Sequence, residues 1–202
     1  MRNSANKHLE KEIFKKGYFE ASILDLSGFV YGKEICHCGI EEKNKFIHFP
    51  IKGHEKICLD CLQKNDLELI HDSEHGTITL ESHPLPKELE YEFDINNFVS
   101  KDSIRGLMNT PDFVNIQGER WLIHCKDFMV FKGLWDTKDF TENSKEKNGK
   151  KLFIEMTEEY YNYLWDEYGF AENEITYSWE DVFYYAFECK HCGKLRGYWD
   201  CS

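Results

Sequence analysis

The chain has 202 residues with 41% hydrophobic and 15% aromatic content, which excludes a disordered protein and suffices for one large domain or two small ones. Its net charge of −12 disfavours direct binding to DNA or RNA, whose phosphates are met by Lys and Arg clusters, and favours basic protein partners. No stretch approaches the roughly 18 uninterrupted apolar residues of a transmembrane helix, and no apolar signal segment follows the start. We therefore expect a soluble cytoplasmic protein that does not contact nucleic acid or a membrane.

Eight cysteines are the main chemical signal, because a reducing cytoplasm keeps thiols free or places them on a metal ion. Residues 17–70 contain two close pairs, Cys36 with Cys38 and Cys58 with Cys61, and nineteen residues separate Cys38 from Cys58. Two cysteine pairs with about 15–20 residues between them are typical of tetrahedral zinc sites. We predict a structural zinc ion in a small unit at 17–70, where short runs also favour β-structure.

The one-residue gap between Cys36 and Cys38 leaves the ligand set of this site open. Two residues usually separate such a pair, so His37, His48 or His54 is an alternative to Cys36. Four buried cysteines without a metal are the other interpretation, since free cysteine is commonly buried.

The middle of the chain predicts a short helix and the start of a buried block. Apolar residues at helical spacing favour a helix at 99–108 that begins after Ser100 or Asp102 and ends before Pro111. The apolar block at 120–125 then predicts buried structure.

The next segment predicts an exposed loop and a second helix. The polar stretch 141–150 has almost nothing to bury and reads as a loop. Thr157 is the expected N-cap of a helix that ends at Gly169. One face of this helix carries apolar and aromatic residues that we assign to the core, namely Tyr161, Leu164, Trp165 and Tyr168.

A β-favouring segment at 182–188 leads directly into Cys189-Lys190-His191-Cys192-Gly193. This order predicts a strand, a metal-binding knuckle and a returning strand, as in a zinc ribbon. Two cysteines are half of a zinc site, and the missing ligands could be His124, Cys125, His191 or Cys201, with Cys125 the preferred third ligand. A complete second zinc site and a metal-free hairpin both remain open.

His124-Cys125 followed by Asp127 also contains the residue types of a thiol nucleophile and its base. Neighbours in a strand point to opposite faces, so a packed and inert Cys125 is the favoured interpretation. The zinc deaminase pattern and a phosphate-binding glycine loop are absent from the sequence. We therefore expect no enzyme.

Residues 152–188 contain no Lys or Arg and interleave acidic with aromatic side chains. Tyrosines surrounded by carboxylates suit the docking of a basic protein, because charge speeds encounter and aromatic contacts slow dissociation. The candidate partner-binding residues are Glu158, Glu159, Tyr160, Tyr163, Asp166 and Glu167. The alternative is a solvated acidic helix over an aromatic core.

Three stretches resemble the CbrC family, a group of bacterial proteins whose name is tied to colicin tolerance. They are Cys38-Gly39 together with 57–62, the stretch 110–113 leading into 117–127, and 187–194. The first knuckle of that family usually reads Cys-x-x-Cys-Gly, which would place its first cysteine on Ile35, and Leu59 and Met129 replace a proline and a cysteine. The resemblance implies a zinc-containing, non-enzymatic protein of bacteriocin or toxin tolerance.

These features together predict an α+β protein with a zinc-knuckle unit at 17–70 and an α+β body at 71–202 that ends in a zinc-ribbon-like β-hairpin, or one continuous domain over 1–202. The leading functional hypothesis is an immunity or toxin-tolerance protein that binds a basic bacterial toxin. One alternative is a zinc-ribbon regulator that contacts nucleic acid or the transcription machinery. The other is a Cys-dependent enzyme that uses Cys125.

Overall fold

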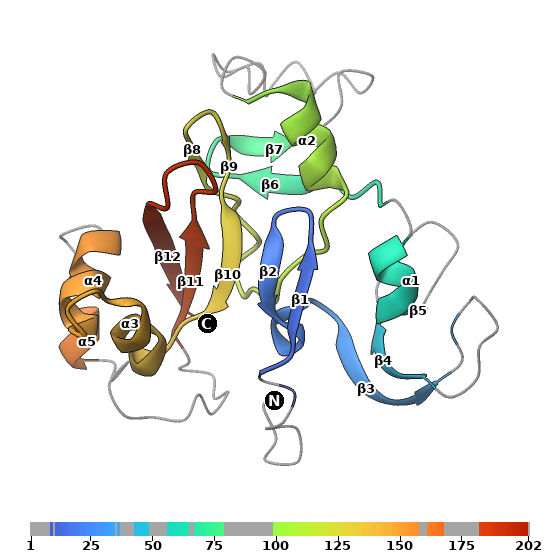
Figure 1. Cartoon of the computed structure of the whole chain (residues 1–202), viewed down its shortest axis with the longest axis horizontal. Coiled ribbons are helices and arrows are strands. Elements are labelled where there is room, and N and C mark those ends of the chain that lie inside the picture. The colour runs from blue at the N-terminus through green and yellow to red at the C-terminus, as the bar shows by residue number, and fades with distance from the viewer. Residues whose placement is uncertain are drawn as a thin grey trace.

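Helices and small hairpins surround one five-stranded sheet in an α+β arrangement (Figure 1). The computed structural model describes residues 9, 11–34, 36, 43–48, 56–64, 67–78, 99–157, 161–167 and 182–201. The predicted α+β class is confirmed, and so is a C-terminal strand hairpin with cysteines that could hold a metal ion.

The central sheet joins the two ends of the chain. Its strand order is β1-β2-β10-β11-β12. These strands are β1 (Ile13–Lys16), β2 (Phe19–Ser22), β10 (Val130–Leu134), β11 (Val182–Glu188) and β12 (Leu195–Cys201). β2 runs parallel to β10 and pairs with it at Phe19 and Phe131, whereas the other neighbours are antiparallel. Strand β2 lies within the predicted unit 17–70 yet belongs to the sheet of the body, and a domain boundary at residue 70 stays a prediction.

Smaller strand pairs and short helices lie around this sheet. A three-stranded sheet consists of β3 (Phe29–Glu34), β4 (Lys43–Ile47) and β5 (Ile57–Cys58), and α1 (Leu59–Lys64) follows β5 directly. Two hairpins pair β6 (His71–Ser73) with β7 (Gly76–Ile78) and β8 (Ile123–His124) with β9 (Asp127–Phe128). A 3-10 turn, η2 (Ile23–Asp25), follows β2.

Helix α2 (Lys101–Met108) confirms the predicted helix at 99–108. The Ser100 hydroxyl accepts a hydrogen bond from the Ser103 N–H at 3.0 Å, which satisfies one of the free donors at the helix start. Ile104 and Leu107 are buried on one face. Beyond the helix, the Thr110 hydroxyl accepts a hydrogen bond from the Tyr18 N–H at 2.9 Å, so the end of α2 is fixed against the β1–β2 turn.

The predicted loop at 141–150 is wrong at both ends. Helix α3 (Thr137–Asn143) enters this stretch, and α4 (Gly149–Met156) starts within it. A capping box between Asp136 and Asp139 starts α3, whose one buried side chain is Phe140, so the helix leaves no periodic apolar pattern in the sequence.

Thr157 ends helix α4, a role that the sequence did not predict. Its backbone N–H donates to the Phe153 carbonyl at the C-terminus of α4, and the next described helix is the short α5 (Leu164–Glu167). Residues 158–160 and 168–170 lie outside the described residues, and so does the expected stop at Gly169. Tyr161, Leu164 and Trp165 contact an aromatic core, as predicted.

Strand β11 separates two hydrophobic cores because alternate side chains point to opposite faces. Tyr185 and Phe187 join the larger core, in which the rings of Phe113 and Phe131 stack with centroids 4.3 Å apart. Tyr184 and Ala186 face the smaller core under α3, α4 and α5, which lie beside β11 and β12 in Figure 1. Both faces of β11 are therefore covered, which accounts for its almost uniformly apolar sequence.

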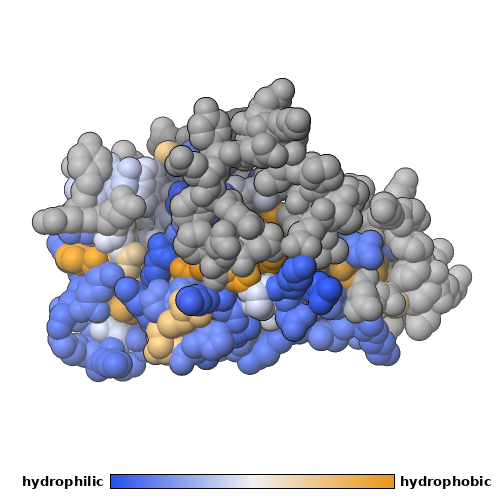
Figure 2. All heavy atoms as spheres, turned by 90° about the horizontal axis from the view of Figure 1, so that it is seen from above, coloured by the Kyte–Doolittle hydropathy of each residue, from blue (hydrophilic) through white to orange (hydrophobic). Residues whose placement is uncertain are grey.

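The described surface on the face shown in Figure 2 is mostly hydrophilic, with small hydrophobic patches. The large hydrophobic side chains that reach solvent include Ile70, which is 64% exposed, and Ile154, which is 40% exposed. No helix within the described ranges is both long and apolar enough to cross a bilayer.

The smaller core predicts a contrast between two neighbours on α4. Phe153→Ala should lower the free energy of unfolding by about 3–5 kcal/mol, because it empties a fully buried site beside Phe140 and Tyr184. Ile154→Ala, on the exposed side of the same turn, should cost no more than about 0.5 kcal/mol. Urea unfolding of both variants measures the difference, and equal losses would contradict the described packing.

Candidate metal centres

The first candidate centre contains Cys36, Cys58 and Cys61, whose sulfur atoms all lie within 4.8 Å of one another. Cys58 ends β5 and Cys61 lies in the first turn of α1, so the strand-to-helix junction brings both to one side. The Cys58 N–H donates to the sulfur of Cys36 at 3.3 Å, which fixes the third member. Burial raises the pKa of the Cys58 thiol.

The fourth predicted ligand, Cys38, lies outside the described residues, as do His37 and His54. His48 follows β4 but is not part of the three-sulfur group. The structure therefore brings together three of the four predicted cysteines, including Cys36 despite its unusual spacing from Cys38.

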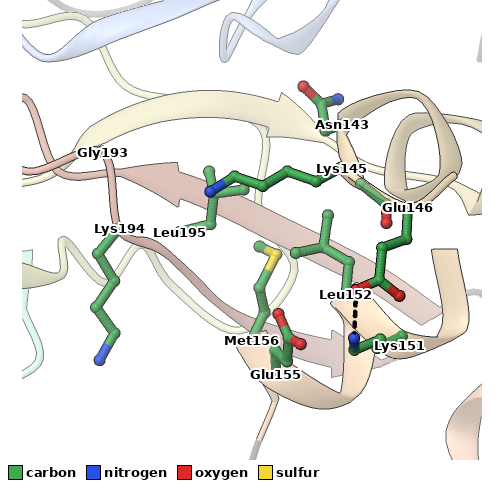
Figure 3. Close-up of a pocket in the computed structure, with 11 residues that line it drawn as sticks. Asn143, Lys145, Glu146, Lys151, Leu152, Glu155, Met156, Gly193, Lys194 and Leu195 are labelled. Carbon is green, nitrogen blue, oxygen red and sulfur yellow. Dashed lines mark hydrogen bonds and ion pairs between the residues drawn. The ribbon is translucent and has the colours of Figure 1, made fainter. Parts of the chain in front are cut away.

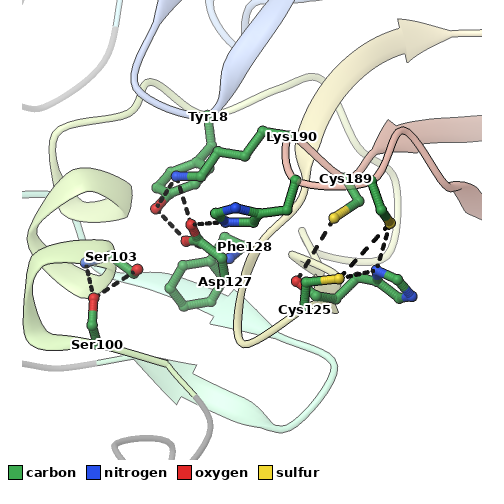
Figure 4. Close-up of polar contacts among 11 residues, drawn as sticks. Tyr18, Ser100, Ser103, Cys125, Asp127, Phe128, Cys189 and Lys190 are labelled. Atoms are coloured by element: carbon green, nitrogen blue, oxygen red, sulfur yellow. Dashed lines mark hydrogen bonds and ion pairs between the residues drawn. The ribbon is translucent and has the colours of Figure 1, made fainter.

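The second candidate centre lies where two hairpin tips meet. It contains His124 and Cys125 from the β8–β9 hairpin and Cys189 and Cys192 from the β11–β12 connection, with all four ligand atoms within 4.8 Å of one another (Figure 4). The knuckle at 189–194 is closed by two backbone hydrogen bonds, from Cys189 N–H to the Lys194 carbonyl and from Gly193 N–H to the Cys189 carbonyl. Gly193 has a φ of 70°, which a glycine adopts at little cost.

The tip of the β8–β9 hairpin explains how adjacent residues can both face the centre. Cys125 and Lys126 have positive φ angles of 53° and 60°, as in a type I′ turn, which usually contains Asn and Gly. Cys125 is therefore in a turn and exposed, and its predicted packing inside a strand is wrong. Positive φ at two non-glycine residues costs about 1–3 kcal/mol each, and such strain is typical of functional sites.

The separations in the second centre fit a tetrahedral metal ion. Bonds of about 2.3 Å to sulfur and 2.0–2.1 Å to nitrogen place two sulfur ligands about 3.8 Å apart and a sulfur and a nitrogen about 3.5 Å apart. The sulfurs of Cys125 and Cys192 are 3.8 Å apart, and the Cys192 sulfur lies 3.5 Å from His124 Nδ1. The distance from the Cys125 sulfur to the same nitrogen is shorter, at 3.2 Å.

Crowding of the thiols separates their pKa values. Contact with Cys192 and Cys189 raises the pKa of Cys125 to about 11. Burial alone would raise the pKa of Cys189, but hydrogen bonds involving His124 and the backbone N–H groups of His191 and Cys192 lower it to about 6. Three thiolates at these distances repel one another, and a bound cation removes that cost.

Asp127 anchors the knuckle to the rest of the chain (Figure 4). Its carboxylate accepts a hydrogen bond from the Tyr18 hydroxyl at 2.6 Å and lies 2.6 Å from Lys190 Nζ and 2.8 Å from His191 Nε2. Burial would raise the pKa of Asp127, but hydrogen bonds from Lys190, Tyr18 and His191 hold it well below its usual range. In the sequence, only the position of Asp127 next to the His124-Cys125 pair indicated that it belongs to the site.

Of the four residues that could complete the C-terminal half-site, two lie beside the cysteine pair and two face elsewhere. The structure brings His124 and Cys125 to the cysteine pair. The His191 ring faces Asp127, and Cys201 lies at the far end of β12, opposite Val182.

The predicted partner-binding residues are only partly described. Glu158, Glu159 and Tyr160 lie outside the described residues, and Glu167 is the last residue of α5. The Tyr163 side chain is 42% exposed. Asp166 is also exposed and makes an ion pair with Lys150 of α4 at 2.6 Å.

A polar cleft lies beside the knuckle, between α4 and the start of β12 (Figure 3). Lys145, Lys151 and Lys194 line it together with Glu146 and Glu155, and Lys151 pairs with Glu146 at 2.7 Å. Among the residues that the structure describes, its lining contains no cysteine or histidine.

The chain belongs to an uncharacterised protein family, UPF0167, whose family model matches residues 18–201. The match covers both candidate centres and all strands from the second onward. No solved structure gives a significant match to this chain.

The second centre predicts a difference between two exposed or half-exposed cysteines of the same hairpin. Cys192→Ser should remove about one equivalent of metal per chain, because sulfur is lost from the ligand group. Cys201→Ser, in the same hairpin but outside the group, should leave the metal content unchanged. Metal analysis of protein purified without chelator checks this, and full metal content in Cys192→Ser would contradict the assignment.

Asp127 should act as a positioning residue for the same centre. Asp127→Asn should weaken metal binding by about 10- to 100-fold, since residues that orient the ligands typically contribute that much. Chelator competition measures the affinity, and Lys138→Gln, an exposed change on α3, is the control. Unchanged affinity in Asp127→Asn would show that the knuckle holds its geometry alone.

Proposed function

We propose that this member of UPF0167 is a non-enzymatic zinc-binding protein of bacterial toxin tolerance that acts in the cytoplasm by binding a basic protein toxin. The observation that carries the proposal is the group of three cysteines and one histidine at the meeting point of two hairpins. Such a group fills all four positions of a tetrahedral ion and leaves none for a substrate, which is typical of structural zinc.

Zinc is the metal that this ligand chemistry favours. Thiolate and imidazole ligands suit zinc, and the sulfur–sulfur and sulfur–nitrogen separations suit its tetrahedral geometry. Zinc at both cysteine groups would hold short hairpins in place for a docking surface. Cys38 is the proposed fourth ligand of the first centre.

Protein binding is favoured by charge and by the exposed aromatic side chain on the acidic segment. A chain of net charge −12 attracts basic proteins and repels nucleic acid. Tyr163 is exposed close to Asp166, and tyrosine is among the residues that most often dominate binding energy. The resemblance to the CbrC family supplies the biological context of colicin tolerance.

The enzyme alternative meets a chemical difficulty. A thiol nucleophile reacts as the thiolate, and contact with Cys192 and Cys189 raises the pKa of Cys125, which disfavours that form. As a zinc ligand it would be engaged with the metal. Loss of function in Cys125→Ser with metal and fold retained would favour the enzyme over the binding protein.

A protection assay with binding kinetics tests the proposal. Bacteria that express the chain are exposed to a panel of colicins, and a colicin that they survive is then used for kinetics. Tyr163→Ala should speed dissociation about tenfold or more, and a tenfold change corresponds to about 1.4 kcal/mol of binding free energy. The melting temperature should stay unchanged. Ile154→Ala, an equally exposed apolar change on α4, is the matched control.

Charge contributes to the same test. Asp166→Lys should slow association, because the partner is basic. Since Asp166 pairs with Lys150, the double change Lys150→Asp/Asp166→Lys keeps an internal ion pair and the net charge. Slow association in both variants supports direct contact with Asp166. The proposal would be contradicted if the expressing bacteria survived none of the colicins in the panel. It would also be contradicted if all of these variants gave full protection.

A further inference from the structure

A third group of potential ligands lies away from both cysteine centres. Nδ1 of His71 is 2.8 Å from Glu119 Oε1 and 3.0 Å from Asp112 Oδ1, and the three ligand atoms lie within 4.8 Å of one another. His71 is in β6, Asp112 follows α2, and Glu119 precedes Trp121. These residues are far apart in the sequence, so their spacing gives no metal-binding pattern.

The three segments are held in place by backbone hydrogen bonds. Trp121 N–H donates to the Asp72 carbonyl at 2.9 Å and Glu74 N–H to the Trp121 carbonyl at 3.0 Å, which couples β6 to the segment that carries Glu119. The Asp112 carbonyl accepts from Ser27 N–H at 3.0 Å. The group therefore rests on paired backbone, which suits a preorganised site.

Supporting donors also orient the Glu119 carboxylate. Its Oε2 accepts a hydrogen bond from the indole N–H of Trp121 at 3.1 Å, and its Oε1 accepts from the Asp72 N–H at 3.3 Å. Hydrogen bonds of this kind are typical around carboxylates that bind a metal.

One nitrogen cannot satisfy both carboxylates. Nδ1 carries at most one proton and already contacts Glu119, and in the described part of the chain the buried Oδ1 of Asp112 has no donor other than that shared nitrogen. A buried carboxylate oxygen without a donor costs free energy. An imidazolium between two carboxylates also leaves a net charge of −1, whereas a divalent cation with a neutral imidazole brings the group to zero.

We propose that His71, Asp112 and Glu119 form a divalent-cation site that is separate from the cysteine centres. One imidazole nitrogen and two carboxylate oxygens suit Mn²⁺, Fe²⁺ or Zn²⁺. The His71 side chain is fully buried, while that of Asp112 is 39% exposed, so an ion reaches the site past Asp112. Three protein ligands leave coordination positions for water, unlike the group of three cysteines and one histidine.

A titration with Mn²⁺ tests the site on the full chain. The chain is first loaded with two equivalents of Zn²⁺ for the thiol groups, and free Mn²⁺ is then followed by electron paramagnetic resonance. Thiolates do not favour Mn²⁺, so binding reports on the oxygen-rich group. The expected result is one Mn²⁺ per chain with the zinc retained. No bound Mn²⁺ at millimolar concentration would overturn the proposal.

Two variants and a matched control locate the ion. Asp112→Asn and Glu119→Gln should each weaken Mn²⁺ binding by at least about 10- to 100-fold. Loss of a residue that only supports a ligand typically costs that much, and loss of a ligand should cost no less. Asp102→Asn removes an exposed carboxylate of α2 that lies outside the ligand group and should leave binding unchanged. Because the Asp112 side chain is partly exposed, Asp112→Asn should keep the fold, and circular dichroism verifies this. Unchanged Mn²⁺ affinity in folded Asp112→Asn would also overturn the proposal.

Discussion

The carboxylate of Asp127 connects three parts of the chain that are far apart in the sequence. It accepts a hydrogen bond from Tyr18 of the N-terminal hairpin, and it pairs with Lys190 and His191 of the C-terminal knuckle. Asp127 itself begins β9, two residues after Cys125. A buried carboxylate with several donors is stable, but it becomes costly when any donor is removed. The meeting of the two hairpin tips therefore depends on how this one anion is satisfied.

The two ends of the central sheet are stabilised by different means. On the side of α3 to α5, Phe140 packs edge to face against Phe153 and Tyr184, and the helices cover a well-buried aromatic core. In the β8–β9 hairpin Phe128 is buried in the larger core, but the strained tip at Cys125 and Lys126 is exposed. A metal ion would supply stability where apolar burial does not, because binding free energy at a structural site is folding free energy.

Local patterns were sufficient for elements whose signals lie in adjacent residues. Ser100 and the apolar spacing after it predicted α2, and the β-favouring run before Cys189 predicted β11 and its return. Helix α3 was missed because one buried phenylalanine and a capping box make no periodic pattern. The C-capping role of Thr157 was missed for a related reason, since the helix before it begins in a stretch that looked wholly polar.

The candidate centres show the same limit. The cysteine pairs at 36–38 and 58–61 predicted all three members of the first group, whereas the pair at 189–192 gave half of the second and left its other ligands among four alternatives. Cys125 was expected to pack inside a strand, and only the positive φ angles at its turn bring it beside His124 at the same site. His71, Asp112 and Glu119 come from three segments, and no spacing rule joins them.

The exposed sulfurs of Cys125 and Cys192 also give the metal-free chain a redox liability. They lie 3.8 Å apart, so an approach of less than about 2 Å reaches the length of a disulfide bond. Oxidation would then remove two ligands at once and lock the hairpin tips together without an ion. Metal loading and oxidation compete for the same two atoms, and a chain that loses its metal in air would not regain it until a reductant reopened the bond.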